Sequence, residues 1–161
     1  MARQIIKNRE IVEDHWQHLA DDDSLPNTPA DIIVSVERWR KDREALLARD
    51  GKLGVTIGGG IPVDEIVDDL PHFDLVAVRF PEFRDGRGYS YARLLRDRYG
   101  FKGEIRAVGN VLRDQLFYME RCGINAFEVQ EDRDINDALK AFHELTVRYQ
   151  PAADGLPTPA P

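Results

Sequence analysis

Residues 79–90 are the richest stretch of this chain in groups that bind anions: Arg-Phe-Pro-Glu-Phe-Arg-Asp-Gly-Arg-Gly-Tyr-Ser. Arg79 ends the clearest apolar run of the sequence, and Arg87 lies in the loop that follows. A guanidinium binds an oxyanion through two parallel hydrogen bonds, so two or three converging arginines would suit sulfate, sulfite, phosphate or carboxylate. Ser90 can cap the next helix, whose first amides also favour an anion. The segment indicates a site for a small oxyanion.

The distribution of charge supports this choice. Between Asp74 and Gly123 there are ten Lys and Arg against seven Asp and Glu, whereas the rest of the chain has twelve against twenty-two. A basic middle in a chain of net charge -7 suits a small anion or an acidic partner, while the overall charge disfavours nucleic acid and anionic membranes. The side chains that we expect at this anion or partner site are Arg79, Asp85, Arg87, Tyr89, Ser90, Arg93, Arg106 and Asp114.

A second interpretation of the same arginines stays open. Asp85 and Gly86 can form a tight turn while the arginines pair with Glu82, Asp85 and Asp114, which would leave no cation for a ligand. Tyr89 and Asp114 could act as acid or base, but nothing in the residue pattern gives either a shifted pKa or a shared pocket. The sequence therefore assigns no catalytic residue.

Cysteine and histidine counts limit the chemistry further. Cys122 is the only cysteine, whereas iron–sulfur clusters need several thiolates and a structural zinc site about four Cys or His ligands. His15 and His18 are expected to be surface residues beside Trp16. We predict neither a metal nor a cofactor, although the sequence does not decide whether a flavin binds non-covalently. Gly58-Gly59-Gly60 lacks the spacing of a dinucleotide or P-loop motif and is interpreted as a flexible connection.

The elements that must position these residues alternate regularly. Five short apolar runs predict strands, at 31–35, 53–57, 74–80, 104–108 and 126–129. Helical patterns follow at 36–50, 63–70, 89–99, 111–122 and 135–149. Such alternation predicts an α/β fold of successive βα units with parallel pairing. Arg106 and Glu128 interrupt the last two strands at alternate positions, which favours the partly polar inner face of a partial TIM-like barrel over a doubly wound open sheet.

The chain ends differ from this regular middle. The pattern predicts an N-terminal hairpin and loop at 1–29, the βα-repeat domain at 30–150, and a disordered, Pro-rich tail at 151–161. No apolar run approaches the roughly 20 residues that span a bilayer, and the first residues contain no signal-peptide core. With a single cysteine, these features favour a cytoplasmic location.

Several motifs together resemble a bacterial family, domain of unknown function 934. They are Phe83-Arg-Asp-Gly-Arg-Gly-Tyr-Ser-Tyr-Ala-Arg-Leu-Leu-Arg96, Gly103-Glu-Ile-Arg-Ala-Val-Gly109, Asp114-Gln-Leu116, Arg121-Cys-Gly123 and Phe127-Glu128. The similarity runs from about Ile32 to Val129 and departs from the family pattern at Gly58–Gly60. Members are described as oxidoreductases of sulfite reduction, so the resemblance implies a role in sulfur metabolism.

One cysteine cannot hold the sirohaem and iron–sulfur cluster of sulfite reductase. The resemblance therefore implies an accessory protein that partners the reductase haemoprotein or its electron donor; whether it is itself an enzyme stays undecided. Two alternatives remain: a small oxyanion-binding enzyme or sensor built on the arginines, and a homo-oligomeric assembly module whose sheet edges pair between subunits.

Overall fold

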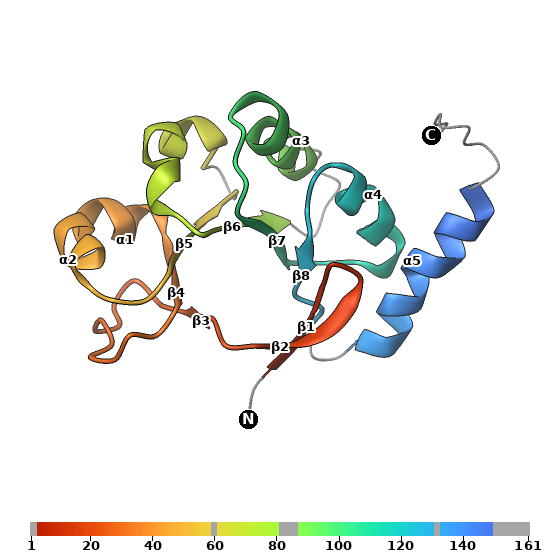
Figure 1. The fold of residues 1–161 in the computed structure, drawn as a ribbon, viewed down its shortest axis with the longest axis horizontal. Coiled ribbons are helices and arrows are strands. Elements are labelled where there is room, and N and C mark those ends of the chain that lie inside the picture. The colour runs from red at the N-terminus through yellow and green to blue at the C-terminus, as the bar shows by residue number, and fades with distance from the viewer. Residues whose placement is uncertain (1–2, 59–60, 81–86, 131–132, 150–161) are drawn as a thin grey trace.

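The computed structural model describes residues 3–58, 61–80, 87–130 and 133–149 (Figure 1). Eight strands form one sheet that curls into a half barrel, with the helices outside it. The strands are β1 (Arg3–Lys7), β2 (Glu10–Asp14), β3 (Gln17–His18), β4 (Ile32–Ser35), β5 (Leu53–Ile57), β6 (Leu75–Phe80), β7 (Glu104–Gly109) and β8 (Ala126–Phe127).

The sheet has the order β2-β1-β8-β7-β6-β5-β4-β3. From β4 to β8 the strands are parallel neighbours in sequence order, which confirms the five predicted strands and the partial barrel. The N-terminal segment belongs to the same sheet: β1 pairs antiparallel with β8, and β3 pairs parallel with β4 at the opposite edge. Residues 14–17 thus carry the chain from one edge of the sheet to the other, below the arc of strands in Figure 1.

The helical segments are α1 (Val36–Lys41), α2 (Arg43–Ala48), η1 (Val63–His72), α3 (Arg87–Arg93), η2 (Leu94–Arg98), η3 (Arg113–Gln115), α4 (Leu116–Arg121) and α5 (Ile135–Tyr149). They lie along the convex side of the sheet (Figure 1). No described helix is long and apolar enough to cross a membrane.

Alternation along the strands sorts the side chains into two layers. In β4, Ile32 and Val34 belong to the large core between sheet and helices, whereas Ile33 belongs to a small inner cluster. That inner cluster also contains Leu75, Ala77 and Val108, with Trp16 packed against it. Because both faces of β6 are covered, its sequence is a continuous apolar run. The concave face is therefore packed with apolar side chains at the level of this cluster.

The predicted hairpin is present, and its turn explains its register. Asn8 and Arg9 have φ angles of 54° and 66°, as a two-residue turn between twisted antiparallel strands requires. Asn tolerates this left-handed conformation better than most residues. Strand β3 was not expected, since Gln17 and His18 carry no apolar or β-branched side chain.

Three helices differ from the expected single segments. The predicted helix 36–50 is broken at Asp42 into α1 and α2. In place of the helix 111–122, η3 precedes a shorter α4, because the chain leaves β7 through a left-handed turn at Gly109 (φ 87°) and Leu112 stays extended. The predicted helix 63–70 is a 3-10 helix, Val63–His72, which begins after Pro62 and includes Pro71. The tail 151–161 and the loop glycines Gly59 and Gly60 lie outside the described residues.

Candidate functional site

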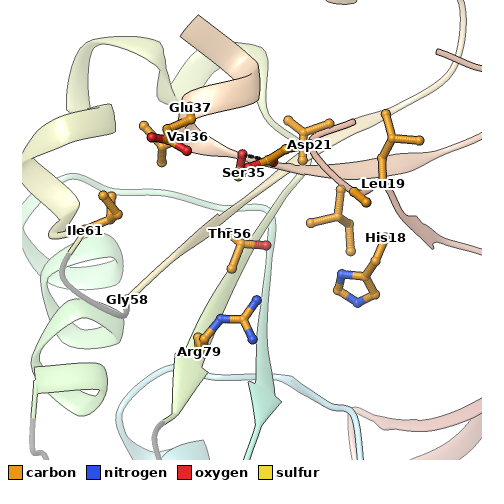
Figure 2. Close-up of a pocket in the computed structure, with 13 residues that line it drawn as sticks. His18, Leu19, Asp21, Ser35, Val36, Glu37, Thr56, Gly58, Ile61 and Arg79 are labelled. Atoms are coloured by element: carbon orange, nitrogen blue, oxygen red, sulfur yellow. Dashed lines mark hydrogen bonds between the residues drawn. The ribbon is translucent and has the colours of Figure 1, made fainter. Parts of the chain in front are cut away.

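A pocket of about 460 Å³ opens at the carboxyl ends of β4, β5 and β6. We call it the mouth pocket. It is lined by His18, Leu19, Ala20, Asp21, Ile33, Val34, Ser35, Val36, Glu37, Thr56, Gly58, Ile61 and Arg79 (Figure 2). Carboxyl ends of parallel strands are where barrel folds place their ligands. The pocket is thus the expected place for a site in this architecture.

Arg79 supplies the cation of the mouth pocket. It is the penultimate residue of β6 and follows Leu75 and Ala77 on the concave face of the sheet. Its side chain is exposed and, among the described residues, forms no ion pair. Gly58 has a φ of 101°, and a Cβ built on it would lie 2.8 Å from the Arg79 carbonyl oxygen. This glycine lets the end of β5 approach Arg79 closely.

Hydroxyl and imidazole groups lie around Arg79. Thr56 lies between Arg79 and Ser35 in Figure 2, and His18 is to one side. The Nε2 atom of His18 is 2.8 Å from Oε2 of Glu128, so its other ring nitrogen is not used by that contact. Ser35 is the N-cap of α1: its Oγ accepts from the Arg38 amide at 3.0 Å and donates to Oδ1 of Asp21 at 2.6 Å.

Arg106 lies one layer deeper on the same concave face, and its guanidinium is already engaged. Its Nε donates to Glu104 at 2.8 Å, its Nη1 to Glu128 at 2.8 Å and to Asp14 at 3.0 Å, and its Nη2 to Asp14 at 3.1 Å. The side chain is 1% exposed. We call these four residues the Arg106 cluster. Three carboxylates around one guanidinium leave it unable to serve an anionic ligand, so it does not join Arg79 as expected.

The pKa values of the cluster follow from this packing. Burial alone would raise the pKa of Asp14, but the guanidiniums of Arg106 and Arg3 and the Trp16 amide together bring it below 3.8. Burial likewise opposes ionisation of Glu128, whereas His18 and Arg106 lower its pKa below 4.5. Burial also disfavours the Arg106 cation, yet the surrounding carboxylates raise its pKa above the ordinary value of an arginine. All three groups are charged at neutral pH. The carboxylates of the cluster also pair with three partly exposed side chains, those of Arg3, Lys7 and His18.

The remaining predicted site residues lie elsewhere. Tyr89 packs on Phe80 and Tyr118 at centroid distances of 5.2 and 4.8 Å, and burial, with Cys122 and Tyr118 nearby, raises its pKa. Ser90 and Arg93 are exposed on α3, and Arg93 contacts Tyr118 and Cys122 rather than the mouth pocket.

Three further predictions fall at or beyond the limits of the structure. Asp114 is exposed in η3 and does not line the pocket. Asp85 lies outside the described residues, and Arg87 begins α3 without a described side chain. Among the predicted residues whose side chains the structure describes, Arg79 alone lines the mouth pocket.

The pocket contains polar residues that sequence reasoning missed: His18, Asp21, Ser35, Glu37 and Thr56. For two of them a signal existed. Ser35, Thr56, Ala77 and Arg106 are register partners across β4 to β7, so polar residues recur at the same inward-facing level of successive strands. His18 and Asp21 had no such signal, because β3, which carries the chain to this edge of the sheet, was not predicted.

Cys122 is buried, and burial, more than its Arg93 and Tyr118 neighbours, determines its raised pKa. It thus packs as a small hydrophobe, as expected at a helix end. Within the residues that the structure describes, no three His, Cys, Asp or Glu side chains group so as to hold a metal ion.

The family model of a bacterial protein of unknown function (DUF934) matches residues 54–159. The chain belongs to this family. The part that matches the DUF934 model contains Thr56, Arg79 and Arg106, whereas His18 and Ser35 precede it. No curated protein matches the chain.

Proposed function

We propose that this protein binds a small oxyanion in the mouth pocket and does so as an accessory protein of assimilatory sulfite reduction. The observation that carries the proposal is Arg79, a guanidinium at the carboxyl end of a central strand that forms no ion pair with the described residues. Although the chain has a net charge of -7, an arginine that has no carboxylate partner among the described residues can attract an external anion.

The surroundings of Arg79 suit an oxyanion. The guanidinium offers a planar fork of donors that matches two oxygens of sulfite, sulfate or phosphate. The Thr56 hydroxyl can donate to a third oxygen. Apolar side chains such as Ile33 and Ile61 complete the wall. Because Arg79 is exposed, solvent screens its charge, and we expect a dissociation constant of about 1 mM for a free anion.

The connection to sulfite reduction is supported by the resemblance of the motifs around Arg87 and Arg106 to a family described in that context. Sulfite is a pyramidal oxyanion of the size that one arginine and one hydroxyl can hold. A chain with one cysteine lacks the thiolates of a sirohaem and iron–sulfur enzyme. The protein would therefore deliver, hold or sense the oxyanion beside the reductase haemoprotein or its electron donor.

Anion binding is tested by titration calorimetry with sulfite, sulfate and phosphate at constant ionic strength. Wild-type protein should bind at least one of them, and Arg79→Ala should lose that binding. Arg98→Ala is the matched control, because Arg98 is an exposed arginine that does not line the pocket. Equal loss in both variants would indicate a general charge effect and contradict the site.

The partnership is tested separately. Affinity purification of the tagged protein from its native host should retain the sulfite reductase haemoprotein or its electron donor. Deletion should slow growth on sulfate or sulfite as sulfur source but not on cysteine. Purification without either protein, together with normal growth on sulfite, would refute the accessory role. Anion binding would then be decided by the calorimetry alone.

A further inference from the structure

The mouth pocket is much larger than the anion proposed for it. Its volume is about 460 Å³, whereas a water molecule takes about 30 Å³ and an inorganic oxyanion is only a few such volumes. Pockets of roughly 300–1,000 Å³ are those that enclose small organic ligands. An oxyanion held at Arg79 would therefore fill only one end of the pocket.

The other end of the pocket is lined by carboxylates, with Arg38, Arg40 and Lys41 next to them; of these cations, Arg38 and Arg40 are paired with Asp42 and Glu65. Asp21 and Glu37 line the wall formed by the loop after β3 and the first turn of α1. In Figure 2 these carboxylates and Arg79 lie on opposite sides of Thr56. One oxygen of Asp21 accepts from Ser35, which leaves the second oxygen without a bond among the described residues. Glu37 is exposed and forms no ion pair within that same part of the chain.

Two carboxylates repel an oxyanion, so they argue against a second anion at that end. They suit a cation or a hydrogen-bond donor instead, because an ionised carboxylate only accepts hydrogen bonds. The pocket wall also includes Val36 and Ile61, which offer apolar contact to a short carbon chain. The pocket thus offers a cation at Arg79, carboxylates on the far side of Thr56, and apolar contact in its wall.

From this arrangement we propose that the ligand is a small zwitterion: an organic sulfonate, sulfate ester or phosphate whose short carbon chain ends in an ammonium group. The oxyanion head lies at Arg79 and the ammonium lies between Asp21 and Glu37. This inference rests on the proposed oxyanion site and names the class of molecule that the site takes.

Matched pairs of compounds test the proposal. Titration calorimetry compares ethane-, propane- and butanesulfonate with the corresponding aminoalkanesulfonates, and ethyl phosphate with phosphoethanolamine. In at least one pair the amino compound should bind about fivefold tighter, which equals about 1 kcal/mol. The carbon chain length at which the amino compound gains most in affinity over the plain compound reports the distance between the two ends of the pocket. The phosphate pair shows whether the site prefers a sulfonate or a phosphate head group.

Charge-removing variants assign the ammonium end. Glu37→Gln and Asp21→Asn should remove the advantage of the amino compounds and leave the plain sulfonates bound as before or tighter. Glu37→Gln serves even if Asp21→Asn disturbs the Ser35 contact, since Glu37 is exposed and unpaired among the described residues. Glu44→Gln, an exposed residue of α2 outside the pocket, is the matched control.

Each outcome separates the two proposals. If plain and amino compounds bind equally and both require Arg79, the oxyanion site stands and the zwitterion inference is overturned. An amino advantage that survives Glu37→Gln and Asp21→Asn also overturns it. If no compound binds in an Arg79-dependent way, the oxyanion site itself is wrong and the inference falls with it.

Discussion

Two arginines on neighbouring strands of the half barrel face the same concave side and yet differ in every other respect. Arg106 of β7 pairs with Ala77 of β6, and Arg79 lies two residues further along β6. Arg106 is 1% exposed and bonded to three carboxylates, whereas Arg79 is exposed and forms no ion pair with the described residues. A buried ion must be matched by its neighbours, because desolvation is too costly otherwise. The unmatched cation is found where a ligand can supply the missing charge.

Replacing Arg106 is the most direct test of this comparison between the two arginines. In Arg106→Met, the carboxylates of Asp14, Glu104 and Glu128 lose their common partner while buried or half-buried. We expect the free energy of unfolding to fall by about 3–5 kcal/mol, measured by urea denaturation at pH 7. A loss below about 1 kcal/mol would show that water, or the remaining partners Arg3, Lys7 and His18, compensates the three carboxylates without Arg106.

Acid should weaken the same cluster in the wild type. The pKa values of Asp14 and Glu128 lie below their ordinary values of 3.8 and 4.5 in the folded protein. The unfolded chain therefore binds protons first, and the stabilisation that is complete above these values is lost as the pH falls through the lowered pKa values. In Arg106→Met, burial is no longer opposed by that cation. The difference in unfolding free energy between wild type and variant should shrink from pH 7 to pH 3.5; a constant difference would contradict this account.

Gly58 tests whether the end of β5 holds Arg79 in place. In Gly58→Ala, a Cβ at φ 101° would meet the Arg79 carbonyl oxygen at 2.8 Å, and we expect a cost of about 1–3 kcal/mol together with weaker anion binding. Gly100→Ala is the control, because Gly100 also has a positive φ of 65° but a Cβ there would have no atom within 4 Å. Denaturation and calorimetry on both variants separate backbone strain from displacement of Arg79. Equal effects would deny Gly58 a positioning role.

Ser35 lies in the same register level of the sheet as Arg106, three strands away, and lines the mouth pocket. Ser35→Ala removes the N-cap of α1 and the anchor of Asp21, and should cost about 1 kcal/mol of unfolding free energy. Ser90→Ala, an exposed position in α3, should change it by less than about 0.5 kcal/mol. Thermal denaturation of the two variants compares them directly.

The smallest expected effect is at Arg79 itself. Without an anion, Arg79→Ala should alter the unfolding free energy by less than about 0.5 kcal/mol, because an exposed, unpaired side chain contributes little packing. In sulfate or sulfite the wild type should gain stability through binding and the variant should not. A large loss of unfolding free energy in Arg79→Ala without anions would show that Arg79, like Arg106, stabilises the fold.

Local patterns predicted most of the fold. The apolar runs ending at Ser35, Ile57 and Phe80 indicated the central strands within a residue or so, because buried parallel strands are continuous in hydrophobicity. Arg106 and Glu128, at alternate positions of the last strands, correctly indicated a polar concave face and hence a partial barrel.

The site was harder to predict because it depends on distant contacts. Asp14 lies 92 positions before Arg106 in the chain, and no local sequence pattern predicts that its carboxylate pairs with that arginine. Likewise His18 and Asp21 reach the mouth pocket only because β3 joins the far edge of the sheet. Arg79 was predictable, since its position at the end of an apolar strand is a local feature.

The pairing of β1 with β8 has a consequence for biosynthesis. Ile6 is the register partner of Phe127, so β1 leaves the ribosome long before the strand that it pairs with has been made. Contacts this distant in sequence slow folding, because loop closure precedes the gain from pairing. The Arg106 cluster depends on a contact of similar sequence distance, because Asp14 lies 92 positions before Arg106, so the cluster is complete only once β2 has joined the sheet.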